Sequence, residues 1–197
     1  MRCFILPVCV LSVSAQPVVT VTLYDLVGLK PEIREGMKRE TARIFLASDV
    51  KVEWVDCEIE GKPINLSACA IPLGPRRMML QIAPGLNKTK PKAAGWAVTQ
   101  GTSCVFACIH PERVKELARD AKWDLDDLLG HVVAHELGHL LLCSSAHTHA
   151  GVMRARWETE DLRGLSHAGL VFLRGQLSNV RLRAHQRPPD EGQCCGK

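Results

Sequence analysis

Residues 131–142, HVVAHELGHLLL, carry three histidines and one glutamate among apolar residues and a single glycine. Together with the preceding DLDDLLG, which starts near a capping aspartate at Asp124, they predict a helix over residues 124–142. A helix that is apolar around its whole circumference has to be covered on every side. We therefore expect this helix at the centre of the fold, where each polar side chain needs a partner.

The spacing of the polar residues in this helix is typical of a metal site. His135 and His139 are four residues apart, so both imidazoles project from one face and can reach one ion. Glu136 lies between them, where its carboxylate can approach a metal-bound water without being a ligand. The alternative is two core histidines that hydrogen-bond to backbone groups. Because one metal ion satisfies all three side chains, the pattern favours a zinc (Zn²⁺) hydrolase site.

A catalytic zinc usually takes three protein ligands and one water, so a third ligand has to lie downstream. The candidates are two histidines and two carboxylates: His147, His149, Glu158 and Glu160. Residues 143–157 have no clear period and are predicted to be irregular, and the small residues 144–146 offer a turn. This favours His147, with His149 as the runner-up. His131, one turn before His135, is expected beside the site or on the surface, not as a ligand.

The motifs of this region resemble those of the metzincin clan of zinc peptidases. The shared elements are HELGH at 135–139, a histidine soon after the helix, and GVM at 151–153, which looks like the Met-turn. The clan's HExxHxxGxxH spacing is not kept, because Leu142 stands in place of the glycine and Ser145 in place of the third histidine. The sequence is more similar to small exported bacterial peptidases with the pattern HELGHLLLG, a histidine, GIM and an arginine. In that alignment Cys143 replaces the turn glycine and His147 is the third ligand.

The resemblance implies a zinc endopeptidase that acts on a peptide or protein substrate. Zinc would be bound by His135, His139 and His147 with water in the fourth place, and Glu136 would be the general base. Met153 would pack under the ligands. The substrate would lie along an antiparallel edge strand, for which GWAVTQ at 95–100 is the candidate; an ordinary solvent-facing edge is the alternative. A different hypothesis is an exported zinc-binding protein that is catalytically inactive, although the presence of Glu136 argues against it.

The N-terminal part is predicted to form a strand, a helix and a second strand. PVVTVTLYD, residues 17–25, alternates as a strand, and VKVEWVD, residues 50–56, follows the helix as another. The helix over residues 31–48 starts with proline in its first turn. Such a unit predicts a parallel strand pair with a right-handed crossover. The residues expected to face the core are Val19, Val21 and Leu23 on the first strand, and Ile33, Met37, Thr41, Ile44 and Phe45 on the helix.

The remaining elements complete one domain. Further strands are predicted at residues 76–82, 95–100 and 103–110, a short helix at 111–123 and a last helix at 165–183. The fold class is therefore α+β, with a mixed, mainly parallel twisted sheet, a crossover helix, a long active-site helix and a small C-terminal helical part, as in metzincins.

The N-terminal segment predicts export. Residues 1–15, MRCFILPVCVLSVSA, give one positive charge, an apolar run and small residues, the order of a secretory signal cleaved after Ala15; a buried strand is the alternative. Residues 16–197 are then a single zinc-peptidase domain, secreted or periplasmic. No later segment approaches the ~20 apolar residues of a membrane helix.

With 46% hydrophobic residues the chain is not disordered, and few aromatics and a net charge of +4 give no support for nucleic-acid binding. We expect a monomer.

The cysteines agree with an oxidising compartment. The chain has nine, and removal of Cys3 and Cys9 with the signal leaves seven, so at least one thiol stays outside an intrachain bridge. Cys57 and Cys69 flank a loop and are the expected pair. Cys104 and Cys108 are four residues apart in a predicted strand, about 13 Å between Cα atoms, and cannot bond to each other. Either one needs another partner, such as Cys194 or Cys195. Cys143 is expected to be a small buried hydrophobic residue.

The export prediction can be tested on the protein itself. We expect the exported chain to begin at Gln16, with Cys57 and Cys69 oxidised together. Intact-mass measurement and peptide mapping decide this. A retained Met1, or alkylation of both thiols without prior reduction, would contradict the assignment of an oxidising compartment.

Overall fold

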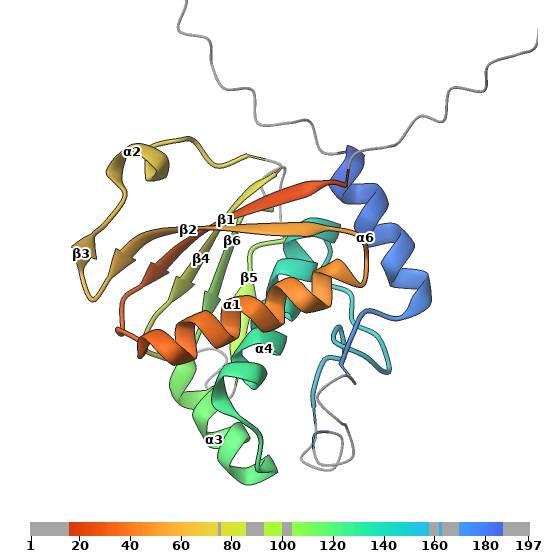
Figure 1. Ribbon diagram of the computed structural model, residues 1–197. Coiled ribbons are helices and arrows are strands. Elements are labelled where there is room, and N and C mark those ends of the chain that lie inside the picture. The colour runs from red at the N-terminus through yellow and green to blue at the C-terminus, as the bar shows by residue number, and fades with distance from the viewer. Residues whose placement is uncertain are drawn as a thin grey trace, which may run out of the picture.

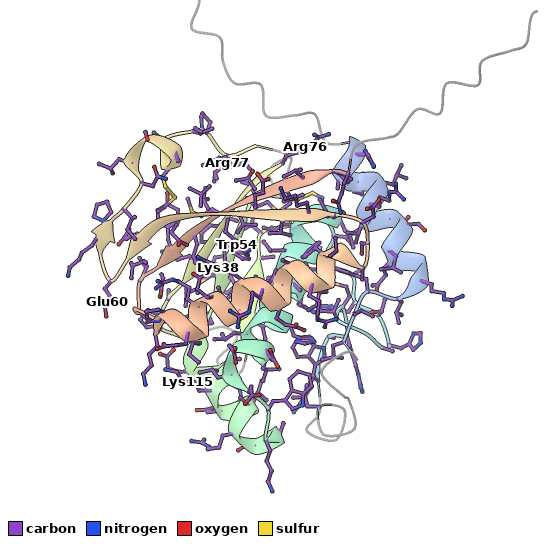
Figure 2. All side chains as sticks on the ribbon, in the orientation of Figure 1. Lys38, Trp54, Glu60, Arg76, Arg77 and Lys115 are labelled. Carbon is purple, nitrogen blue, oxygen red and sulfur yellow. A yellow bond between two sulfur atoms is a disulfide. The ribbon has the colours of Figure 1, made fainter. Side chains whose placement is uncertain are left out.

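The computed structural model describes residues 16–74, 76–85, 93–99, 104–157, 162 and 170–186. Within them a twisted sheet is covered on one face by two helices, α1 (Pro31–Leu46) and α4 (Leu125–Leu142), which lie side by side (Figure 1). The hydroxyl of Thr41 on α1 donates to the carbonyl of Gly130 on α4 at 3.1 Å. Lys38, on the side of α1 toward the sheet, donates to Asp56 on β2 (Lys51–Ile59) at 2.8 Å (Figure 2).

The predicted strand, helix and strand are confirmed. β1 (Val18–Asp25) pairs in parallel with β2, and α1 connects the two strands. Burial follows the alternation in the sequence, because branched apolar side chains on alternate positions of a strand share one face. The core side of the unit contains Val19, Val21 and Leu23 from β1 and Met37, Thr41, Ile44 and Phe45 from α1, and Ile33 packs at its margin.

The sheet is mixed and mainly parallel, as the sequence predicts. Its strand order is β3-β2-β1-β4-β6-β5, where β4 is Arg77–Ile82, β5 is Gly95–Ala97 and β6 is Phe106–Ile109. β4 pairs in parallel with β1 and β6, whereas β5 is antiparallel to β6. Among the described residues β5 forms one edge of the sheet, the place expected for the 95–100 segment. It is shorter than predicted, and residue 100 lies outside the described residues.

The loop between Cys57 and Cys69 is more ordered than expected. β3 (Lys62–Pro63) turns back against β2, and a short helix, α2 (Leu66–Cys69), follows. The side chain of Asn65 caps this helix by accepting from the backbone N–H of Ala68 at 3.3 Å. The predicted disulfide between Cys57 and Cys69 is present and closes the loop.

The helices of the second half follow the period change in the sequence. α3 (Pro111–Ala121) precedes α4, which is buried continuously from Leu128 to Leu141, as expected for a helix that is apolar on all sides. Asp124 is the N-cap residue of α4 but makes no side-chain capping bond. The last helix, α6 (Arg174–Gln186), begins later than predicted, since the backbone N–H of Leu173 donates to the side chain of Gln176. Residues 165–169 of the predicted helix lie outside the described residues.

One expectation about cysteines was wrong. Cys143 is exposed and disulfide-bonded, so it is not a buried hydrophobic residue, and it is the partner that Cys104 was expected to need. The pairing follows from topology, since α4 runs back along the sheet and ends beside the start of β6. Cys104 and Cys108 are not bonded to each other, as predicted, and Cys108 is the free cysteine of the described chain. Residues 1–15, 194 and 195 lie outside the described residues. No helix in the described ranges is long and apolar enough to cross a membrane.

Candidate metal centre

Three histidines converge at the C-terminal half of α4. The Nε2 atom of His139 lies 3.0 Å from Nε2 of His135 and 3.2 Å from Nε2 of His147. One nitrogen of each ring falls within 4.8 Å of the others. In the described part of the chain, no other set of three or more His, Cys, Asp or Glu side chains lies this close together. Ligands about 2.0–2.1 Å from a tetrahedral zinc are about 3.3–3.4 Å apart, so the two measured separations are close to those of a zinc site.

Hydrogen bonds on the far side of two rings fix where their lone pairs point. Nδ1 of His135 donates to the carbonyl of Val152, and Nδ1 of His139 donates to the carbonyl of Ser144, each at 2.7 Å. A carbonyl oxygen can only accept, so each ring, when neutral, has its proton on Nδ1 and a lone pair on Nε2. Two such lone pairs that face each other at 3.0 Å are not a hydrogen bond. A bound cation would satisfy them, and metal-binding histidines are commonly oriented by such carbonyl partners.

Burial keeps the His135 ring in the form that a metal would need. His135 is 9% exposed and His139 5%, whereas His147 is exposed and forms the outer side of the cluster. Burial lowers the pKa of His135 to about 4, and the neighbouring His139 and His147 act in the same direction against the bond to Val152. The His135 ring is therefore neutral at pH 7, with Nε2 able to bind a cation.

The end of α4 explains why His147 returns to the helix. Cys143 has a φ of 48°, in the left-handed region, and the N–H of Ser144 donates to the carbonyl of His139 at 3.1 Å. This turn reverses the chain. The next anchor is Thr148, whose N–H donates to the carbonyl of Met153 at 2.9 Å. His147 lies between these two fixed points and faces the cluster. His149 is exposed and is not part of the cluster.

The GVM segment packs against the part of α4 that contains His135 and His139. Gly151 has a φ of 75°, and the N–H of Val152 donates to the carbonyl of Val171 at 3.0 Å. Met153 is buried, and a Cβ on Gly138 would lie 2.6 Å from its Sδ atom. Glycine within HELGH therefore lets Met153 pack directly against α4 between the two histidines. The segment also supplies the Val152 carbonyl that orients His135.

Glu136 lies on the side of the cluster toward β5. It is 6% exposed, and a Cβ on Gly95 would be 3.0 Å from its Cγ atom, so the edge strand passes directly beside the carboxylate. Burial and, to a smaller extent, Glu136 raise the pKa of the neighbouring Cys108 thiol to about 11, so this thiol is neutral. A cavity of about 560 Å³ opens between β5 and residues 154–157. Its lining includes Gly95, Trp96, His135, Glu136, His147 and Trp157.

His131 has a different role from the three clustered histidines. It is fully buried, Nδ1 donates to the carbonyl of Asp127 at 2.8 Å, and Nε2 lies 3.4 Å from the carboxylate of Glu40. Burial lowers its pKa.

The ring of Trp157 stands edge-on to both His131 and His135, with centroids 6.5 and 5.8 Å away. Sequence reasoning did not identify Trp157, which has no motif around it. Glu158 and Glu160, the carboxylate candidates, lie outside the described residues.

Comparisons with known proteins identify the fold. An archaemetzincin from Methanopyrus kandleri is similar over 85% of this chain and 96% of its own, with a TM-score of 0.51 and 17% sequence identity. A zinc-dependent peptidase from Methanocorpusculum labreanum is similar over 84% of this chain and 99% of its own, with a TM-score of 0.52 and 14% identity. No protein-family model matches the sequence, and no curated protein matches it. The chain thus has the fold of these two proteins at low sequence identity.

Proposed function

We propose that this protein is an exported zinc endopeptidase in which His135, His139 and His147 bind zinc and Glu136 is the general base. The observation that carries the proposal is the convergence of three histidine nitrogens on the wall of a cavity that Glu136 also lines. The fold is similar to that of a zinc-dependent peptidase, which supports it. Three histidines complete the protein ligands of a catalytic zinc, so neither Glu158 nor Glu160 is needed.

The chemistry divides between the ion and the side chains. Zinc, when bound, supplies a Lewis acid that lowers the pKa of a water toward ~7 and polarises the substrate carbonyl. Glu136 takes the proton of the attacking water and passes it to the leaving amine as the C–N bond breaks. The carbonyls of Val152 and Ser144 hold the rings of His135 and His139 so that Nε2 stays directed at the ion.

The substrate proposed is a peptide or protein segment in extended conformation. β5 is the edge strand beside Glu136, and a peptide can add to such an edge as a further strand through main-chain hydrogen bonds. The side chains of Trp96 and Trp157 line the cavity on either side and give apolar surface to the flanking residues. Export is proposed from residues 1–15, and the bridges Cys57–Cys69 and Cys104–Cys143 are consistent with an extracellular or periplasmic protein.

The proposal is tested by metal analysis together with a cleavage assay. We expect the purified protein to contain one zinc per chain and to cut an unfolded protein at internal peptide bonds, with mass spectrometry identifying the new termini. A chelator should abolish cleavage, and zinc should restore it. One bound zinc without cleavage of any unfolded protein would instead identify a catalytically inactive zinc-binding protein.

A further inference from the structure

The Cys104–Cys143 disulfide ends at the turn that builds the metal centre. Cys104 is buried just before β6, and Cys143 is the C-cap residue of α4. Ser144, the next residue, supplies the carbonyl that holds the His139 ring, and His147 follows four residues after Cys143. The bridge therefore joins the sheet to the one backbone segment on which the orientation of one ligand and the return of another depend.

The backbone conformation at Cys143 gives this bridge a specific task. A φ of 48° is in the region that glycine adopts readily and other residues rarely, and helices often end with glycine there. The turn nevertheless depends on that conformation. With Cys143 left-handed, its own N–H donates to the carbonyl of Leu140 and the N–H of Ser144 donates to that of His139, both at 3.1 Å. A covalent link to the buried residue Cys104 opposes relaxation of Cys143 to a more common conformation.

We propose that the Cys104–Cys143 disulfide is a positioning element of the metal centre, which holds Ser144 against His139 and His147 within reach of the ion. The inference rests on the metal site of the proposed function but not on peptide cleavage. A second consequence follows from linkage. If the closed bridge strengthens zinc binding by some factor, bound zinc must favour the closed bridge by the same factor.

The first test compares zinc affinities by competition with a chromophoric chelator. We expect Cys104→Ser with Cys143→Ser to weaken zinc binding by about 10- to 100-fold, the usual effect of losing a group that orients a ligand. Cys57→Ser with Cys69→Ser removes a bridge in the α2 loop and should leave the affinity within about twofold of the unchanged protein. Cys104→Ser with Cys143→Gly should recover most of the loss, because glycine restores the turn without the bridge. A general loss of stability would not give this recovery.

The second test uses the unchanged protein and does not depend on the folding of any variant. The protein is equilibrated with glutathione buffers of set ratio, in which two glutathione thiols give two electrons and two protons to a protein disulfide and are themselves joined as glutathione disulfide. Thiol labelling and peptide mapping then give the closed fraction of each bridge in the zinc-loaded and metal-free protein. We expect zinc to raise the equilibrium constant for closing Cys104–Cys143 by about 10-fold or more and to leave that of Cys57–Cys69 unaffected.

Several results would overturn the inference. These are unchanged zinc affinity without the Cys104–Cys143 bridge, an equal loss on removing either bridge, no recovery with glycine at position 143, and an equal closed fraction of Cys104–Cys143 with and without zinc. Absence of zinc binding by the unchanged protein would overturn it as well. Zinc binding that follows the expected pattern in a protein that cleaves nothing would support the inference and refute the peptidase function.

Discussion

Glu136→Gln is expected to lower peptide cleavage by about 10²- to 10⁴-fold while one zinc per chain stays bound, because general acid–base catalysis is worth that much. Glutamine has nearly the same shape but cannot accept the proton of the attacking water. Glu136 lines the same cavity as the three clustered histidines and lies next to Gly95 of the edge strand, so the substitution removes the proposed base and leaves the histidines in place.

A matched control for this variant is Glu53→Gln. Glu53 is an exposed residue of β2 whose partner is Lys51 at 2.7 Å, and exposed pairs of this kind contribute little to stability. The Glu53→Gln protein should cleave substrate at the same rate as the unchanged protein. Metal analysis and initial cleavage rates are the measurements. Loss of zinc together with activity in Glu136→Gln would mean that Glu136 is a ligand, and full activity would refute the proposed mechanism.

His147→Ala is expected to empty the metal centre at zinc concentrations at which His149→Ala keeps its ion. The first substitution removes one of three nitrogens that converge on the site, whereas His149 is exposed and outside the cluster. Loss of a group that orients a ligand weakens metal binding by about 10- to 100-fold, and loss of a ligand itself should weaken zinc binding more than that.

The two histidines make a close comparison because they are two residues apart in the same irregular segment and both exposed. Zinc per chain after dialysis against buffers of set free zinc is the measurement. If His149→Ala loses zinc and His147→Ala retains it, the return of the chain after α4 is different from that described here, and the third ligand is misassigned.

The central helix and the shared face of its two clustered histidines could be predicted because their signals are local. An apolar stretch with no charge except Glu136 indicates a buried helix, and a spacing of four residues places His135 and His139 on one face. The alternation of Val19, Val21 and Leu23 and the period of α1 predicted the parallel pair in the same way. These patterns depend on which residues are near in sequence, so a single chain is enough to read them.

The groups that orient His135 and His139 could not be predicted, because they are backbone atoms of segments that fold back onto α4. The carbonyls of Val152 and Ser144 have no side-chain signal, and their role depends on how the chain folds after α4. The pairing of Cys104 with Cys143 spans 39 residues and follows from α4 running back along the sheet. In the sequence, Cys143 stands where a glycine would end the helix, and this marked the position as unusual. Its partner, however, could be found only in three dimensions.

The most direct test of zinc-dependent peptidase function is to titrate the metal-free protein with zinc while cleavage of an unfolded protein is followed. We predict no cleavage before zinc is added, a rate that rises in proportion to zinc, and a plateau at one zinc per chain. Glu136→Gln should bind the same amount and stay near the baseline throughout. Cleavage that is equally fast without zinc, or no cleavage at any zinc concentration, would contradict the function proposed here.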